Sequence, residues 1–402
     1  MLDIAEAPPS AAHIAARCAA LRADYLAARR NGATRHRDIA ARLGVTEAEL
    51  LAAHVMPLAG SVSAPTAALE GRTQRLRTQK LTGPWPTLVA GLEGVGPVMA
   101  LTRNASCVHE KTGVYSGASA SGPAGREMGL VLGSEIDLRI FFSHWAHGFA
   151  VEEDGERGLQ QSLQFFDAHG QAVHKVFAQP GTQRDIWAAL VQAHRADEQR
   201  PGLVVRPAPG TAAETADALI DLRAFREGWA GLRDTHDFFG LLRRHGLART
   251  QALRLADPAY AQRVEASAAR EVAQAAARDA LPVMVFVGNP GMIQIHTGAV
   301  KRVEVMGPWL NVLDPGFNLH LREDHIHQAW AVRKPTSDGV VSSLELFDAQ
   351  GNTIAMFFGE RKPGRPELCA WRRLVDSLVD RAQDQPGAAR AWQPLPGECA
   401  AC

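Results

Sequence analysis

The sequence predicts an α+β fold in which one module, a large antiparallel β-sheet with flanking helices, occurs twice in tandem. Blocks with helical, Ala- and Leu-rich periodicity alternate with blocks of short β-branched and apolar runs that are broken by Gly and Asn. The two strand blocks match each other: Val98-Met99 matches Val283-Met284 at a separation of 185, and the hairpins SLQFFDAHG and SLELFDAQG match at 181. Such long-range self-similarity indicates a tandem duplication.

The duplication divides the 402 residues into five predicted segments. They are an N-terminal helical segment that packs on the first half (1–55), a first repeat (56–195), a linker rich in Pro, Gly and Ala (196–220), a second repeat (221–390) and a tail (391–402). Because 46% of the residues are hydrophobic, both repeats have enough apolar side chains to form a core.

The N-terminal segment is predicted to be helical over residues 12–55, and Thr46 with Glu49 has the pattern of a capping box at the start of one helix. The stretch RHRDIAARLGVTEAELLAA also resembles a helix-turn-helix with Gly44 at the turn, so a DNA-associated role is one alternative. The formal net charge of zero and the single copy of the motif favour a packing element instead.

Strands and helices alternate in the same way in the two repeats. From Gly96 onwards short apolar runs predict strands, including a hairpin that turns at residues 167–170, and residues 185–194 are predicted to form a helix. Helical periodicity then covers residues 222–280. The strand pattern returns with PVMVFVGNPGMIQIHTG, and the repeat closes with a helix in ELCAWRRLVDSL.

The composition leads us to expect a cytoplasmic protein. The first residues lack the basic stretch and apolar core of a signal peptide, and nowhere do about 18 apolar residues follow one another. Lys plus Arg and Asp plus Glu both number 43, so no overall charge attracts nucleic acid or an anionic membrane. The five cysteines are scattered, which disfavours a disulfide framework. Cys399 and Cys402 are interpreted as an exposed, oxidisable tail, with a redox or transfer role as the alternative.

Positions that differ between the repeats are the candidates for function, because a residue kept in both halves is expected to serve the scaffold. The shared FDA-G hairpin is therefore interpreted as turn chemistry. In contrast, Arg139 becomes His320 in the second repeat, and His109 becomes Gln294.

His236 is the first candidate site residue. It lies in EGWAGLRDTHDFFGLLRRHG, where Trp229, Leu232, His236 and Phe239 follow one another at spacings of three and four. This spacing predicts that the imidazole lies on the apolar stripe of an amphipathic helix. Two interpretations are open: a core histidine whose ring nitrogens bond to neighbouring groups, or an axial ligand of a haem iron.

Basic residues that could bind the two propionates of a haem are also present, since guanidinium and ammonium groups make charge-assisted hydrogen bonds to carboxylates. Lys334 and Arg361 lie at strand-to-turn positions, where they are either solvated turn residues or carboxylate contacts. Arg139 is flanked by apolar residues in IDLRIFF, and a charge inside such a strand must face a partner or a cavity.

These residues fall in motifs that resemble the bacterial haemin-degrading factor family, the HemS/HmuS/ChuS/PhuS-like haem-utilisation proteins. The motifs include LTRNASCVHEKTGVY, IDLRIFFSHW, DTHDFFGLLRRHGLARTQA, AWAVRKPTSDGVVSSLELFD and FFGERKPG, and the resemblance extends from about residue 35 to about residue 380. It implies a duplicated α+β fold with large antiparallel sheets. It also implies that haem b lies in a cleft between one sheet and the helices of the C-terminal half.

The resemblance implies a set of haem contacts. His236 in the DxHxFF motif matches the proximal ligand, which is the residue that binds the iron. Arg139 in the DLR motif matches the distal arginine, and Phe141 beside it forms an apolar wall. Lys334 and Arg361 match propionate and distal contacts.

Two further positions, Phe358 and His109, bear on the match to the family. Phe358 stands where the family commonly has Tyr, so one hydroxyl donor of the distal side is missing. His109 in the VHE motif matches a residue proposed to hold a second haem in the first half of some members. A strand histidine beside Glu110 is more often part of a surface pair, and this is the interpretation we favour for His109.

Other metal chemistry is disfavoured. The stretch HEKTG lacks the second histidine of HExxH, which excludes the chemistry of a zinc protease. His320, His325 and His327 form a sequence cluster that is compatible with metal binding, but we interpret them as exposed residues at a strand end and a helix start.

The resemblance supports two functional classes that begin with the same haem complex. A carrier would receive haem on the cytoplasmic side of a haem ABC transporter and deliver it to a separate haem oxygenase. An enzyme would itself open the porphyrin ring to release iron, with His236 as axial ligand and Arg139 stabilising oxygen bound to the iron. The sequence has no flavin or nicotinamide fingerprint, so the electron donor of such an enzyme would be another protein or a small reductant. A DNA-associated regulator is the third class.

Overall fold

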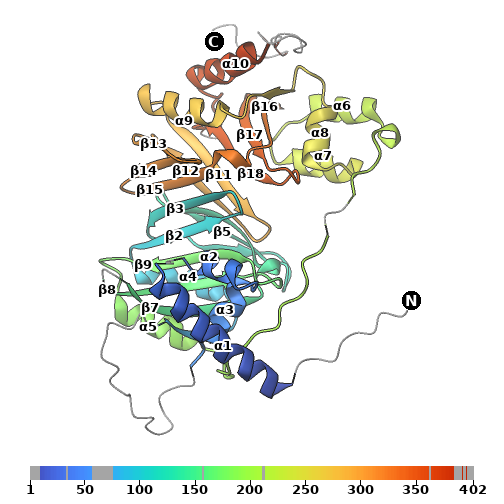
Figure 1. Ribbon diagram of the computed structural model, residues 1–402. Coiled ribbons are helices and arrows are strands. Elements are labelled where there is room, and N and C mark those ends of the chain that lie inside the picture. The colour runs from blue at the N-terminus through green and yellow to red at the C-terminus, as the bar shows by residue number, and fades with distance from the viewer. Residues whose placement is uncertain are drawn as a thin grey trace, which may run out of the picture. The chain divides into compact units, whose positions relative to one another are not determined.

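The chain forms two compact units, which are drawn in Figure 1. The computed structural model describes residues 10–32, 35–56, 76–155, 158–210, 213–361 and 364–383, together with Trp392 and Leu395. Unit 1 comprises Met1–Leu101, Thr112–Ala208 and Pro290–Met292; unit 2 comprises Thr102–Lys111, Pro209–Asn289 and Ile293–Cys402. Within the described ranges, no helix has the length and apolar character needed to cross a membrane.

Unit 1 contains a run of five antiparallel strands in the order β1-β7-β8-β9-β2 and a second run, β4-β5-β6. The bounds are β1 (Leu76–Leu81), β2 (Val98–Arg103), β4 (Ser119–Ser121), β5 (Met128–Leu132), β6 (Asp137–Phe141), β7 (His147–Gly155), β8 (Gly158–Phe166) and β9 (Ala172–Ala178). Strand β2 alternates buried and half-buried residues, the period of a strand with one face on a core. Helices α4 (Trp85–Val95) and α5 (Arg184–Ala193) contribute to that core, and a 3₁₀ helix follows β6 (η1, Phe142–His144).

Three helices precede β1: α1 (Ala11–Arg30), α2 (His36–Arg42) and α3 (Glu47–Ala53). The predicted capping box is present, since Thr46 Oγ1 accepts from the Glu49 backbone N–H and the Glu49 carboxylate accepts from the Thr46 N–H. Every residue of α3 except Glu49 is buried. Because a recognition helix must present side chains to DNA, this burial favours the packing element over the DNA-associated alternative.

Unit 2 contains a run of six strands in the order β10-β16-β17-β18-β11-β12 and a second run, β3-β15-β14-β13. The bounds are β10 (Ala261–Val264), β11 (Val283–Asn289), β12 (Met292–Gly298), β16 (Gln328–Thr336), β17 (Gly339–Phe347), β18 (Thr353–Gly359), β3 (Cys107–Gly113), β13 (Val303–Met306), β14 (Trp309–Asp314) and β15 (Phe317–Arg322). Strand β3 comes from the first predicted repeat, yet it pairs with β15 of the second. The helices are α6 (Leu222–Ala230), α7 (Asp237–His245), α8 (Arg249–Leu255), α9 (Ala268–Arg278) and α10 (Cys369–Gln383), with 3₁₀ turns η2 (Asp217–Leu219) and η3 (Glu323–His325).

Strands β16 and β17 are covered by helices on both faces. In Figure 1, α6, α7 and α8 form one group beside these strands, and α9 and α10 lie apart from that group. Ala331 and Leu344 belong to the core with α9 and α10, whereas Val332 and Phe347 belong to the core with α6, α7 and α8. Because side chains alternate along a strand, the even-numbered residues of β16 and the odd-numbered residues of β17 face the α6–α8 group.

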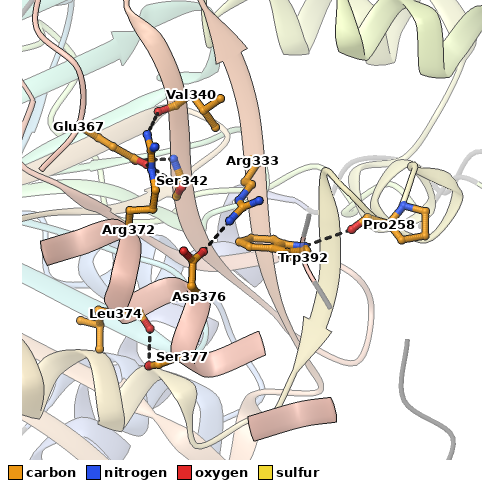
Figure 2. A network of polar contacts seen from close by, with 10 residues as sticks. All are labelled: Pro258, Arg333, Val340, Ser342, Glu367, Arg372, Leu374, Asp376, Ser377 and Trp392. Atoms are coloured by element: carbon orange, nitrogen blue, oxygen red, sulfur yellow. Dashed lines mark hydrogen bonds and ion pairs between the residues drawn. The ribbon is translucent and has the colours of Figure 1, made fainter. Parts of the chain in front are cut away.

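A polar network attaches α10 to its face of the sheet, as Figure 2 shows. Arg333 of β16 donates from Nη2 to Oδ1 of Asp376 at 2.7 Å. The carboxylate of Glu367 accepts from the backbone N–H of Ser342 at 2.7 Å and from Nε of Arg372 at 2.8 Å. These contacts turn the odd-numbered Arg333 away from the α6–α8 group.

The predicted α+β fold and its duplication are confirmed. The paired hairpins β8–β9 and β17–β18 carry a β-bulge at equivalent positions, between residues 165 and 166 and between residues 346 and 347. Gly44 and Gly246, which are 202 residues apart, both adopt a positive φ, of 66° and 63°, in the turn before α3 and before α8. A residue with a side chain is strained in that conformation, so the turn is a repeated device.

Two sequence expectations are wrong. The predicted helical stretch 222–280 is interrupted by the strand β10 and by the break between α6 and α7. Cys369, the first residue of α10, is disulfide-bonded, although the scattered cysteines disfavoured a disulfide framework; Cys18 and Cys107 are buried free thiols. The predictions for Cys399 and Cys402 lie outside the described residues.

Candidate functional site

His236 lies at the N-cap of α7, and the prediction that it occupies an apolar helical stripe is wrong. Its side chain is 91% exposed, and Phe239 of the first turn is 70% exposed. The apolar spacing continues past Ala230, where α6 ends, so it predicted one continuous helix in which His236 would lie on the apolar stripe. Asp234 then accepts the backbone N–H of His236 at 2.8 Å, the local bond by which Asp favours a turn over a helix.

The imidazole of His236 is oriented by one carboxylate. Oδ1 of Asp234 lies 2.6 Å from Nδ1 of His236. The pKa of Asp234 is lowered, mainly because its carboxylate accepts hydrogen bonds from the backbone N–H of His236 and, next in size, from the His236 ring. When Nδ1 carries the proton that is donated to this carboxylate, the lone pair of Nε2 points outward and is free to bind a metal.

One further cation acts on the carboxylate that holds this imidazole. The charge of Arg361 also contributes to lowering the pKa of Asp234, which places the guanidinium within electrostatic range. Nε of Arg361 is buried and has no hydrogen-bond partner among the described residues. Arg243, in the last turn of α7, has its Cζ 5.9 Å from the ring centroid of Phe239. The start of α7 therefore presents an imidazole and an apolar ring, with the charge of Arg361 in range of Asp234.

Lys334 is not an exposed turn residue. Its ammonium is buried on the α6–α8 face of β16, where Nζ donates to Oε1 of Glu345 at 2.7 Å. Burial lowers the pKa of Lys334, and the Glu345 charge opposes this effect. Glu345 accepts one of the three N–H groups of this ammonium, so a propionate would have to use another.

Phe358 lies half-buried on β18, and its ring packs edge-on against Phe286 with the centroids 5.0 Å apart. It is opposite Ser343 of β17 and thus belongs to the α6–α8 face. A phenyl ring at this position offers apolar contact and no hydrogen bond.

Arg139 and Phe141 lie in unit 1 on one half-buried face of β6. The expectation that Arg139 needs a partner is met by Asp137, to which its guanidinium is ion-paired. Across the strand pair, Leu130 is opposite Arg139, and the exposed Met128 is opposite Phe141. This face of β5 and β6 therefore combines apolar side chains with the ion pair between Arg139 and Asp137.

His109 is fully buried in unit 2, and the surface-pair interpretation is wrong. Its ring centroid lies 5.0 Å from that of Phe317, and burial lowers its pKa well below the usual value. The cause is the pairing of β3 with β15, which covers this strand with residues of the other repeat. An axial role for His109 would require unit 2 to open.

The three histidines near η3 do not form a metal site. Nδ1 of His320 is 2.7 Å from Oδ1 of Asn311, and Nδ1 of His325 is 3.0 Å from Oγ of Ser106. Within the described part of the chain, no group of three metal-ligating side chains comes together.

Sequence reasoning missed Asp234, Glu345 and Arg249. The position of Asp234, two residues before a histidine, is a turn signal that could have identified it. Glu345 is a carboxylate within the apolar run SSLELF, which also called for a partner. Arg249 is such a partner, but nothing in the sequence pairs it with Glu345.

Comparison with known proteins identifies relatives along most of the chain. The family model described as haemin-degrading HemS.ChuX domain matches residues 44–194 and 246–378. The hemin transport protein HmuS of Yersinia pestis is 36% identical over 349 residues, which cover 86% of this chain and 93% of that protein.

Two solved structures are similar in fold and sequence. Holo-PhuS, described as a heme-binding protein from Pseudomonas aeruginosa, is 43% identical with a TM-score of 0.81 and covers 90% of this chain and 99% of its own. ChuS of Escherichia coli O157:H7, described as a heme degrading enzyme, is 35% identical with a TM-score of 0.77 and the same coverage. The chain therefore belongs to the haemin-degrading HemS/ChuX family.

Proposed function

We propose that this chain binds haem b, with Nε2 of His236 as the axial ligand of the iron. The observation that carries the proposal is the exposed imidazole whose Nδ1 is held by Asp234. A histidine with one nitrogen bonded to a carboxylate and the other facing solvent has the arrangement found in metal-ligating histidines. The names of the relatives, which refer to heme binding, transport or degradation, support the same ligand.

The neighbouring side chains suit a porphyrin with two propionates. Phe239 offers an exposed apolar ring close to the imidazole in the sequence, and Arg361 offers a guanidinium whose Nε has no hydrogen-bond partner among the described residues. On the distal side, we assign Arg139 and Phe141 as the contacts that the family resemblance implies. Lys334 is assigned to a propionate on the same basis, through an N–H of its ammonium that Glu345 does not use.

We infer that the protein handles haem in the cytoplasm during haem uptake and utilisation. It would take up haem from an ABC transporter and pass it to a haem oxygenase. Ring opening by the chain itself is the second candidate, favoured by the similarity to ChuS. In that case His236 and Arg139 are the catalytic residues, and an external donor supplies the electrons. The bound iron supplies the oxygen chemistry, while Arg139 donates N–H groups toward the distal position.

Titration of the purified chain with ferric haem tests the axial ligand. Replacing His236 by Ala removes the nitrogen that binds the iron, so we expect a shifted Soret band and a Kd raised about tenfold or more. His327→Ala is the matched control, because His327 is also exposed and lies in unit 2. A His236→Ala chain with an unchanged spectrum and affinity would reject the assignment.

Aerobic incubation of the haem complex with ascorbate and catalase separates the two candidates. Loss of the Soret band with growth of a long-wavelength pigment identifies ring opening. A stable spectrum that collapses only when a haem acceptor is added identifies a carrier. Catalase removes peroxide, so non-specific bleaching does not imitate the enzyme.

A further inference from the structure

The carboxylate of Glu345 is the centre of a buried cluster of charges in unit 2. It has no exposed surface and accepts hydrogen bonds from Nζ of Lys334 at 2.7 Å and from Nε and Nη2 of Arg249 at 2.7 and 2.8 Å. Ser343 Oγ lies 3.2 Å from the same carboxylate. Burial alone would raise the pKa of Glu345, but the two cations overcome this effect and lower it. Glu345 therefore holds two cations in fixed positions.

Both cations contact the first turn of α7. Nζ of Lys334 lies 4.8 Å and Cζ of Arg249 lies 5.1 Å from the ring centroid of Phe238. Phe238 is 1% exposed, and its ring also packs edge-on against Trp229 at 4.6 Å. Since Phe238 follows His236 by two residues, the placement of this ring fixes the start of the helix that presents the imidazole.

The first repeat also has a buried ion pair at the start of the equivalent helix, with the opposite charge on the helix and a different sheet position as the partner. Glu47 is the first residue of α3 and pairs with the buried Lys175 of β9. Arg249, 202 residues later, is the first residue of α8, and Met356 is the equivalent of Lys175 at a separation of 181. An ion pair between this helix start and the sheet thus belongs to the shared architecture.

The carboxylate of Glu345 occurs in the second repeat and has no counterpart in the first. The equivalent of Glu345 at a separation of 181 is Gln164, which is also buried. The equivalent of Lys334 at a separation of 181 is Glu153, and the equivalent of Phe238 at a separation of 202 is His36. Nε2 of His36 lies 3.0 Å from Oε2 of Glu153, so these two residues of the first repeat pair with each other. A neutral amide therefore suffices at this position where no exposed histidine has to be presented.

We propose that Glu345 is a positioning residue for the haem ligand. By holding Lys334 and Arg249 against the ring of Phe238, it fixes the N-terminus of α7 and with it the imidazole of His236. This proposal rests on the haem-binding function proposed above.

Ferric haem titration of Glu345→Gln tests the proposal. We expect the Kd to rise about tenfold, the lower end of the effect of outer-shell partners on metal binding, and the Soret band to shift toward that of His236→Ala. Glu345→Asp keeps the charge and should restore the wild-type band in part. Glu47→Gln is the matched control: it breaks the equivalent buried pair, so it lowers the melting temperature but leaves haem affinity and spectrum unchanged.

A second variant decides the matter if Glu345→Gln does not fold. The double change Lys334→Met with Glu345→Met removes both buried charges and retains side-chain volume, which proteins often tolerate. A folded double variant with the wild-type Soret band overturns the positioning role, and a band shifted toward that of His236→Ala supports it. The Soret band is the readout here because the Kd of this variant also reflects loss of the propionate contact assigned to Lys334. If His236→Ala itself leaves the spectrum unchanged, the proposed function fails; if only the Glu345 variants leave it unchanged, the positioning role alone fails.

Discussion

Buried neutral histidines predict that the protein loses stability when the pH falls from 7 to 5. Burial lowers the pKa of His174 and of His296 to about 3, lowers that of His54 to about 4, and depresses that of His109. In the unfolded chain these groups have their ordinary pKa near 6.5, so the unfolded state takes up protons first as the pH falls. The stability they contribute is complete above pH 6.5 and declines between 6.5 and the folded pKa.

The magnitude follows from the difference in proton binding between the two states. Each such histidine removes about 1.4 kcal/mol of unfolding free energy per pH unit once the pH is below 6.5, or about 2 kcal/mol between pH 7 and pH 5. His54 and His174 lie in unit 1, and His109 and His296 lie in unit 2. Each unit should therefore lose about 4 kcal/mol, a large part of the stability of about 5–15 kcal/mol that is usual for a domain.

Urea unfolding at pH 7, 6 and 5, followed by tryptophan fluorescence, measures this loss. His174→Asn removes one titrating ring and retains an acceptor for the hydroxyl of Tyr115, which lies 2.5 Å from Nε2 of His174. We expect the loss between pH 7 and pH 5 to shrink by about 2 kcal/mol in this variant, and to be unchanged in His13→Asn, because His13 is exposed. Equal losses in wild type and His174→Asn, or no loss in wild type, would refute the reasoning.

Two further predictions concern single side chains. Arg139→Ala removes the distal guanidinium, so it should slow any ring opening by at least about tenfold while haem affinity changes less; equal turnover in the ascorbate assay would show that this cation does not act on the reaction. Thr46→Ala removes the oxygen that caps α3, so urea unfolding at pH 7 should give a stability lower by about 1 kcal/mol; an unaltered midpoint would mean that the cap contributes nothing.

The fold could be predicted from the sequence because its signals are local or repeated. The matching hairpins predicted the duplication, and the structure adds a bulge at the same place in both. The break between α6 and α7 was missed because the apolar spacing continues across it. The side chain of Asp234 accepts a hydrogen bond from the backbone N–H of His236, which favours a turn here. The periodicity of apolar residues contains no information about such a local bond.

The surroundings of the charged candidates depended on contacts between distant residues. Strand β16 is buried on both faces, so its sequence has no alternation that would distinguish a buried Lys334 from a solvent-facing one. For this reason Lys334 was predicted to lie at a strand-to-turn position. His109 was assigned to the surface because the strand that covers it, β15, is more than 200 residues away in the sequence. Pairing over such distances leaves no signal near either residue.

The two repeats differ at the start of α7, where the candidate ligand His236 lies. Trp187 of α5 and Trp371 of α10 are equivalent at a separation of 184, and both are buried. Near the start of α7, in contrast, Phe238 replaces the buried His36 at a separation of 202. In unit 1 the buried imidazole of His36 pairs with the carboxylate of Glu153. Unit 2 has Phe238 at the position of His36, and two residues earlier the imidazole of His236 is exposed to solvent. This replacement supports the proposed role of His236 in the second repeat.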